Sequence, residues 1–357
     1  MKKDRIGSFN FGKYPYLNTR VRVMKSKLIL KNDYAKLMKM SHDEISRFIG
    51  DADYKKEMDD LAVNNSGADL LELAINANAA KSFSKIIRLS NGDAKILITE
   101  YLMRFDISNL KAVLRGVYSG ADEAELKDNI IPGGQLLEST ILGLLKKETI
   151  KEVIEDAFIL RVFPYLKNYV PPTDGMTLAS VENYIDLKYY GGLFKLANLL
   201  PKSASVFKVF LENEIDLINI NTILLMKKED IDVENIRSMV ITTGASSNLS
   251  KKIIESAIVA KDFSATLEVF ESGAYSKEMS DGKDEAIKGS LTTIRRELDL
   301  RLMKKAFLLL HQNPLSIAPV LGYILAKEIE MKNLKMISRA KELDLPVEFM
   351  EKNLIVA

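Results

Sequence analysis

The sequence predicts an all-α protein, and three observations support this fold class. Five long stretches carry apolar residues at three- and four-residue spacings, the period of a helix with one buried face: residues 68–90, 94–118, 136–169, 204–228 and 315–343. Alternating, strand-like runs bounded by hairpin dipeptides are scarce. The 357 residues include only 9 prolines, so few positions forbid a helix.

Glycine- and proline-containing segments predict where these helices are interrupted. The segments are Ser119-Gly120, residues 131–134, residues 169–175, Gly191-Gly192, Leu200-Pro201 and residues 273–289. The last of them is polar, charged and punctuated by glycine. It is therefore predicted to be an exposed loop with at most one helical turn.

The composition is that of a globular chain with more than one domain. A length of 357 residues exceeds what one hydrophobic core usually serves, and 47% apolar with 28% charged residues is close to the globular average. Lys and Arg total 51 against 49 for Asp and Glu, with the two signs interspersed. No nucleic-acid partner is expected, because such proteins concentrate a basic excess against the phosphates.

Membrane insertion and secretion are not expected either. The N-terminal residues contain no apolar run of signal-peptide length, which predicts a cytoplasmic protein. Residues 306–326 have the length of a membrane span, but Asn313, Pro314 and Pro319 interrupt them. The segment is predicted to be two buried helices meeting at a turn, with Asn313-Pro314 as the start of the second helix.

A nine-residue pattern occurs three times along the chain. It reads apolar, acid, apolar, any, Asn, Leu or Ile, any, any, Val or Ile, and we call it the Asn signature. Its copies are residues 105–113, 215–223 and 329–337. Its acid and amide positions are Asp106 and Asn109, Asp216 and Asn219, and Glu330 and Asn333. The asparagines are 110 (109 to 219) and 114 (219 to 333) positions apart, so the repeated object is a whole module.

A second element repeats at nearly the same spacing. Ile185-Asp186-Leu187-Lys188 precedes Phe194, and Leu298-Asp299-Leu300-Arg301 precedes Phe307. Both the acids and the phenylalanines are 113 positions apart (186 to 299, 194 to 307). Two elements that repeat at nearly one spacing predict three modules, at residues 1–125, 126–235 and 236–357.

The Asn signature places a polar residue among apolar ones. On a helix, Phe105, Asn109 and Val113 lie along one line, with Ile107 and Leu110 beside it. Burying an amide without partners costs free energy. We therefore expect each asparagine to hydrogen-bond within its own module and to fix the register of its helix; a direct binding role for these residues is the alternative.

No constellation for catalysis, a metal or a cofactor is present. The two histidines, His42 and His311, are far apart and lack partners at ligand spacing. Gly282-Lys283 lacks both the upstream glycine and the following Ser or Thr of a phosphate loop. The sequence therefore predicts a protein without catalytic residues, metal ligands or cofactor.

The strongest local cationic feature lies near the N-terminus. It comprises Arg20, Arg22, Lys25 and Lys27, and Tyr14 and Tyr16 precede it. Apolar Val21, Met24, Leu28 and Ile29 share the segment, so an amphipathic helix with a charged outer face is favoured over a phosphate site. Arg20 and Arg22 are the candidate interface residues.

Four segments of the chain resemble the C subunit of archaeal and bacterial A/V-type ATPases, a family related to the d subunit of eukaryotic vacuolar ATPases. They are YPYLNTRVRVMKSKL at 14–28, YLMRFDISNLKAVLRG at 101–116, the pair VENYIDLKYY at 181–190 and FLENEIDLINI at 210–220, and NPLSIAPVLGYILAKEIEMKNLKMISRAKELDLP at 313–346. The chain departs from the family pattern at Leu225, which stands where the first and third modules have Arg115 and Arg339. Ala340 and Asp344 replace common glycines.

The resemblance implies a funnel of three helical modules related by pseudo-threefold symmetry. It implies a non-catalytic rotor protein that links the central stalk to the membrane proteolipid ring and transmits torque during ATP-driven or ATP-forming ion transport. The protein would then lie at the cytoplasmic face of the membrane, attached indirectly through the ring. A helical-repeat scaffold for soluble partners is the alternative function, and a helical metal-dependent lyase comes third.

Overall fold

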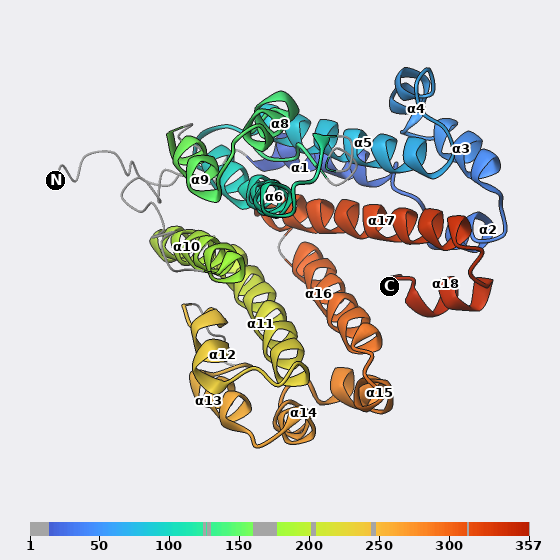
Figure 1. Cartoon of the computed structure of the whole chain (residues 1–357). Coiled ribbons are helices and arrows are strands. Elements are labelled where there is room, and N and C mark those ends of the chain that lie inside the picture. Colours follow the sequence, from blue (N-terminus) through green and yellow to red (C-terminus); the bar gives the residue numbers. More distant parts are fainter. Residues whose placement is uncertain are drawn as a thin grey trace. The chain divides into compact units, whose positions relative to one another are not determined.

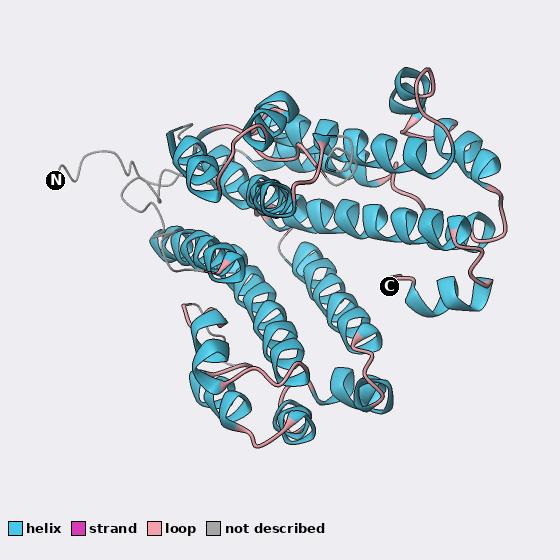
Figure 2. Ribbon diagram, viewed as in Figure 1, coloured by secondary structure: helices cyan, strands magenta, loops and turns pink. Residues whose placement is uncertain are grey.

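The computed structural model describes residues 14–123, 126, 130–159, 177–200, 205–243, 248–312 and 314–356. Within these ranges it contains 17 helices and no strand (Figures 1 and 2), which confirms the all-α prediction. The described residues form two compact units. Unit 1 lies within residues 1–186 and 314–354, and unit 2 lies within 187–313 and 355–357.

Unit 1 combines helices from the first half of the chain with two helices from near its C-terminus. Its helices are α1 (Tyr14–Lys25), α2 (Lys31–Leu37), α3 (His42–Gly50), α4 (Lys55–Leu61), α5 (Gly67–Leu89), α6 (Gly92–Ser119), α8 (Glu138–Leu145), α9 (Ile150–Ile159), α17 (Ala318–Glu342) and α18 (Val347–Asn353). The late helix α17 packs along the early helices α5 and α1 (Figure 1), and α6 contacts α5, α8 and α9. The first half of α10 (Leu178–Leu199) also belongs to this unit.

The sequence explains why the helices of unit 1 form and end where they do. In α5, Leu71, Ile75, Ala79 and Phe83 recur every four residues and are all buried, which is the face that packs against its neighbours. Helix α3 begins with a capping box in which Ser41 and Glu44 bond each other's backbone amides. Helix α6 ends at Gly120, whose positive φ of 73° closes the last turn.

Unit 2 is built around α11. It contains the second half of α10, α11 (Ser205–Lys228), α12 (Val233–Met239), α13 (Lys251–Val259), α14 (Phe263–Glu271), α15 (Ser276–Ile287) and α16 (Thr292–Gln312). Helix α11 contacts α12, α13, α14 and α16, and α15 packs on α16. Asp232, Ser250 and Asp262 cap α12, α13 and α14 by accepting a backbone amide three residues later.

Two predicted interruptions are wrong. Residues 273–289 are not an exposed loop, because α15 occupies most of them and buries Tyr275, Met279 and Ala286. Glycine at 282 serves close packing there: an added Cβ would lie 2.5 Å from Ile294 Cγ1 on α16. Gly191-Gly192 does not end a helix either, since α10 runs through both.

Two expectations about helix extent are also corrected. Residues 136–169 do not form one helix: α8 and α9 are separate, and the residues after 159 lie outside the described ranges. Within 306–326 two helices do meet, but the second begins at Ala318, with Ile317 as its N-cap and Pro319 in its first turn. Asn313 lies outside the described residues, and Leu308 is exposed rather than buried. None of the described helices is both long enough and apolar enough to cross a bilayer.

Candidate functional site

The first copy of the Asn signature ties α6 to the segment that follows it. The Asn109 amide donates to the Ile131 carbonyl at 2.8 Å, and its Oδ1 accepts the Ile131 backbone amide at 3.0 Å. One side chain thus satisfies both polar groups of one residue, an arrangement that we call the amide clamp. Because Asn109 is buried, losing either bond would leave a desolvated polar group.

Asp106 fastens the same segment one helical turn earlier. Its carboxylate accepts the backbone amides of Gln135 at 2.7 Å and Leu136 at 3.1 Å. Gly134 lies so close that an added Cβ would collide with the Asp106 carboxylate. Burial raises the pKa of Asp106 to about 6, and the two amide bonds act in the opposite direction.

The second copy, on α11, repeats the amide clamp. Asn219 donates to the Ile241 carbonyl at 2.9 Å and accepts the Ile241 amide at 2.8 Å. The offset from asparagine to isoleucine is 22 residues in both copies. Ile131 and Ile241 lie beyond the predicted module boundaries at residues 125 and 235, so the expectation that each asparagine bonds within its own module is wrong for these two copies. Each asparagine instead holds the segment that follows its helix.

The acid of the second copy engages a side chain. The Tyr275 hydroxyl donates to Asp216 Oδ2 at 2.8 Å, and both residues are buried. Burial, followed by the Asp216 carboxylate, raises the pKa of Tyr275 above its ordinary value. The Arg301 guanidinium lies 4.4 Å from the centre of the Tyr275 ring and pairs with Glu278 at 3.0 Å. This cluster joins α11, the start of α15 and α16.

The third copy, on α17, forms a buried ionic cluster. Glu330 pairs with Lys327 at 2.6 Å, and the two side chains are only 3% and 2% exposed. Glu330 also accepts the Tyr54 hydroxyl at 2.5 Å and the Ile29 backbone amide at 2.6 Å. Lys327 donates to the Tyr54 hydroxyl at 3.0 Å, so each of the three side chains has more than one partner.

The amide of the third copy lies beside this cluster. Asn333 is buried and hydrogen-bonds the Tyr34 hydroxyl, whose pKa is raised by burial and by Glu330. At the sequence offset of 22 from Asn333 stands Ile355, so an isoleucine occupies this position after all three asparagines. This recurrence is a signal in the sequence that the nine-residue pattern did not include.

Two signature helices, α6 and α17, meet in unit 1. Arg104 and Glu328, each next to a signature copy, form an ion pair, and the Arg104 guanidinium lies 4.1 Å from the Tyr101 ring centre. A hollow of about 340 Å³ between the two helices is lined by Phe105, Ile131 and Met331 among others. The α11 copy belongs to unit 2.

The acidic residues of the second repeated element, Asp186 and Asp299, are both half-buried. Asp186, on α10, accepts Lys111 of α6 at 2.8 and 2.9 Å, and Arg115 forms a bidentate pair with Glu182 one turn earlier. Asp299 is half-buried on α16, between the buried Leu298 and Leu300. In the third module Arg339 pairs with Glu72 at 2.6 Å, whereas Leu225, at the corresponding position of the second module, is 42% exposed.

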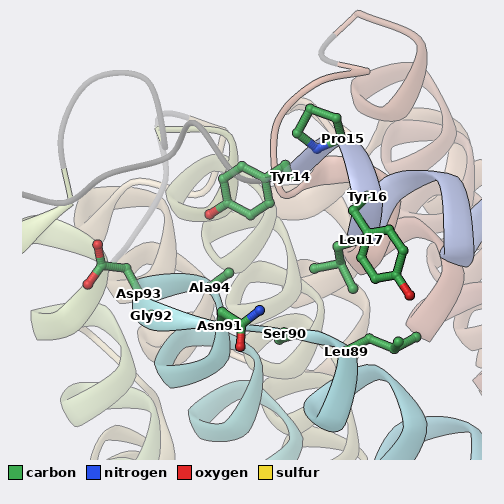
Figure 3. Close-up of a pocket in the computed structure, with 10 residues that line it drawn as sticks. All are labelled: Tyr14, Pro15, Tyr16, Leu17, Leu89, Ser90, Asn91, Gly92, Asp93 and Ala94. Atoms are coloured by element: carbon green, nitrogen blue, oxygen red, sulfur yellow. The ribbon is translucent and has the colours of Figure 1, made fainter.

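The candidate interface residues lie on the outer face of α1. Arg20 and Arg22 are exposed, while Leu17, Val21 and Met24 are buried on the opposite face. A cleft of about 510 Å³ opens at the N-terminal end of α1 (Figure 3). Pro15 and Tyr16 form one wall, and the turn between α5 and α6 forms the other.

The described residues offer no cluster of three or more His, Cys, Asp or Glu side chains that could hold a metal ion. His42 hydrogen-bonds the Ser338 carbonyl at 3.0 Å, and His311 is exposed on α16. The buried contacts of the Asn signature are among the polar groups that the structure does gather.

Comparison with known proteins agrees with this architecture. The family model described as ATP synthase (C/AC39) subunit matches residues 17–353. The C subunit of the A-type ATP synthase of Methanococcoides burtonii is 36% identical over 345 residues, which cover 96% of this chain and 94% of that protein. The corresponding proteins of Methanosarcina barkeri and Archaeoglobus fulgidus are 33% and 29% identical, covering 99% and 97% of this chain and 95% and 97% of their own lengths. The match spans both units and all three copies of the Asn signature, and the chain therefore belongs to the ATP synthase (C/AC39) subunit family.

Proposed function

We propose that this chain is the non-catalytic rotor component that connects the central stalk of an A-type ATP synthase to its membrane proteolipid ring. Family membership over residues 17–353 is the observation that carries the proposal. The relatives are named as subunits of an A-type ATP synthase, an assembly that couples ATP chemistry to ion movement. This chain then assembles with the ring and stalk proteins and lies at the cytoplasmic face, attached to the membrane through the ring.

A torque-transmitting part needs stiffness more than reactive groups. The buried contacts of the Asn signature support this role, because each ties a long helix to another segment of the chain. Lys327, Glu330 and Tyr54 join α17 to the segment before α4, and Asn109 and Asn219 each hold a segment 22 residues away. We propose that the signature is structural and that partner contacts lie on other faces.

We also propose that the chain consists of three related modules, at residues 1–125, 126–235 and 236–357. Two amide clamps with the same geometry and offset support the relation between the first two. The isoleucine at the same offset from Asn333 extends the relation to the third in sequence.

Reconstitution tests the function. The purified chain is mixed with a detergent-solubilised proteolipid ring and with the central-stalk proteins, and co-elution is followed by size-exclusion chromatography. The rotor role predicts one complex containing all three parts. In vesicles that hold the whole synthase, it predicts ATP-driven ion uptake only when the chain is present. Binding to neither part would overturn the proposal. Purification with soluble partners alone, away from the membrane fraction, would favour the alternative helical scaffold.

A further inference from the structure

The positive charge of this chain is concentrated at its N-terminus. Residues 1–32 contain nine Lys and Arg and one acid, Asp4, a formal charge of +8. The other 325 residues contain 42 basic and 48 acidic residues, a formal charge of −6. The signs are therefore interspersed over most of the chain but not here, and residues 14–32 hold five cations and no acid.

Helix α1 presents this charge outward together with apolar surface. Tyr16, Arg20 and Val23 are spaced as one helical line, and Tyr16 and Val23 are 62% and 55% exposed. Arg22 lies exposed at the other edge of the outer surface, because two residues along a helix turn the side chain about 160° away from Arg20. In the part of the chain that the structure describes, neither the Arg20 nor the Arg22 side chain makes a hydrogen bond or ion pair, whereas the Lys27 side chain is held by Asp53 at 2.6 Å. We call Tyr16, Arg20, Arg22 and Val23 the α1 face.

The cleft of about 510 Å³ adjoins the α1 face at Tyr16. Figure 3 shows Pro15 and Tyr16 above the segment that runs from Leu89 to Ala94. The volume is in the range of pockets that accept small molecules or partner side chains. Asp93 is the one acid of the lining, and burial and this carboxylate together raise the pKa of Tyr14 above its ordinary value.

We propose that the α1 face and its cleft dock an acidic segment of another protein of the same assembly. An apolar side chain of that segment occupies the cleft, and its carboxylates bind Arg20 and Arg22, one to two helical turns away. Asp93 determines which way round the segment binds, because its carboxylate repels the carboxylates of the segment from the end of the surface that carries the cleft. The statement that the partner belongs to the same assembly rests on the proposed function. The statement that the α1 face binds an acidic segment rests only on the residues of that face.

The composition of the α1 face favours a protein over an anionic bilayer. Tyr and Arg are the residues enriched at protein interfaces, and the planar guanidinium pairs with a carboxylate through two parallel hydrogen bonds. A helix that binds a membrane inserts its apolar face. The apolar face of α1, with Leu17, Val21 and Met24, is buried inside unit 1, where α1 contacts α17 and α5.

Site-specific cross-linking in the assembled complex tests the proposal. The chain has no cysteine, so Thr19→Cys, exposed beside Arg20 on α1, provides a single attachment point for a benzophenone maleimide. After illumination, mass spectrometry identifies the attached segment. We expect a peptide of another protein of the assembly in which Asp and Glu exceed Lys and Arg. Lys252→Cys, exposed at the start of α13 in unit 2, is the control and should not capture that peptide. Attachment to lipid only, to a non-acidic segment or to nothing would overturn the inference.

Charge reversal provides a second readout that separates this inference from the proposed function. In the reconstitution above, the double variant Arg20→Glu, Arg22→Glu should bind its partner at least tenfold more weakly than the unmodified chain. Lys251→Glu with Lys252→Glu changes the net charge equally on the exposed start of α13 and should bind normally. If both variants assembled equally well, docking of an acidic segment on the α1 face would be refuted, and the proposed rotor role would be unaffected. Failure of the unmodified chain to assemble would refute the rotor role itself.

Discussion

At the scale of single residues, buried polar side chains define how the long helices hold the rest of the chain. The side-chain amides of Asn109 and Asn219 each donate to the carbonyl and accept from the backbone amide of a single isoleucine. The Asp106 carboxylate accepts hydrogen bonds from two backbone amides. Removing one partner of a buried hydrogen bond costs more than the bond contributes, because the other partner stays desolvated. Substituting any of these side chains is therefore expected to lower the free energy of unfolding by more than the contribution of the hydrogen bonds that it removes.

Asn219→Ala is expected to lower the free energy of unfolding by about 3 kcal/mol, because it leaves both polar groups of Ile241 unpaired. Hydrogen exchange at the Ile241 amide should accelerate in the same variant. Asn32→Ala, an exposed asparagine on α2, is the control, with an expected change within about 0.5 kcal/mol. An unchanged exchange rate at Ile241 would show that the amide clamp does not hold this segment.

The raised pKa of Asp106 predicts a definite pH dependence. Its native pKa of about 6 lies above the ordinary value of 3.8, so the native state binds the proton more tightly than the unfolded state. The contribution to stability is therefore full below pH 3.8 and is lost as the pH rises through about 6. Its size is on the order of 3 kcal/mol, at about 1.4 kcal/mol per pH unit.

The comparison of the unmodified chain with Asp106→Asn isolates this contribution from those of other carboxyl groups. Denaturant unfolding at four pH values spaced evenly from about 4 to about 7 should show the unmodified chain losing stability relative to the variant across the interval. Parallel pH profiles for the two proteins would contradict the assignment.

At the scale of elements, two helices depend on contacts made elsewhere in the chain. Helix α15 is polar, with Gly282 in its middle, and it is stabilised by packing on α16 rather than by intrinsic propensity. Helix α17 contains the buried pair Lys327 and Glu330, whose remaining partners, Tyr54 and Ile29, come from loops between early helices. Each helix is thus completed by residues distant in sequence.

Gly282→Ala should destabilise unit 2 although alanine favours helix by about 1 kcal/mol over glycine. The new Cβ would lie 2.5 Å from Ile294 Cγ1 and 2.9 Å from the Ile294 backbone nitrogen, so α15 and α16 must separate. Overpacking of this kind costs about 1–3 kcal/mol. Gly191→Ala on α10, where a Cβ would meet nothing within 4 Å, is the matched control and should be neutral or stabilising in thermal unfolding. Equal effects of the two changes would rule out the close contact.

Lys327→Met should destabilise unit 1 by about 3 kcal/mol or more, because it leaves the Glu330 carboxylate buried without its cation. Adding Glu330→Gln to Lys327→Met should recover part of the loss, since the second change removes the unpaired charge. Chemical denaturation of the two variants and of Glu330→Gln alone makes a double-mutant cycle. Strict additivity would argue against coupling between the two side chains.

At the scale of the whole molecule, unit 1 is completed by the end of the chain. Helix α17 packs along α5 and α1, and many of its apolar residues, including Val320, Leu321 and Ile337, are buried. Removing it would expose the apolar faces of α5 and α1 to water. The N-terminal helices therefore need residues beyond 313 to form a stable core.

A chain truncated after residue 313 is expected to lose amide protection throughout α5, while α11 and α14 to α16 in unit 2 stay protected. Hydrogen exchange with mass spectrometry would measure both. Addition of a separate peptide of residues 314–357 should restore protection in α5. Full protection of α5 in the truncated chain would show that unit 1 folds without α17.

Several features of the fold and the candidate site could be predicted from local sequence. The apolar period placed α5, α6, α11 and α17 within a few residues of their observed ends, because each buries a continuous face. Recurrence of Asn109, Asn219 and Asn333 marked the three helices that carry the buried contacts. The period failed for α15, whose polar sequence is explained only by the packing of Gly282 against Ile294.

The helical class, the repeated Asn signature and the cationic outer face of α1 could all be predicted without a structure, because each depends on the spacing of residues close together in the chain. The partners of the buried polar groups could not, because they depend on how distant segments pack. Ile131 and Ile241 lie 22 residues from their asparagines, Ile29 lies 301 residues from Glu330, and Tyr54 lies 276 from it. Such partners are chosen by the packing of distant segments, since the cost of a buried polar group can be offset by any correctly placed donor or acceptor.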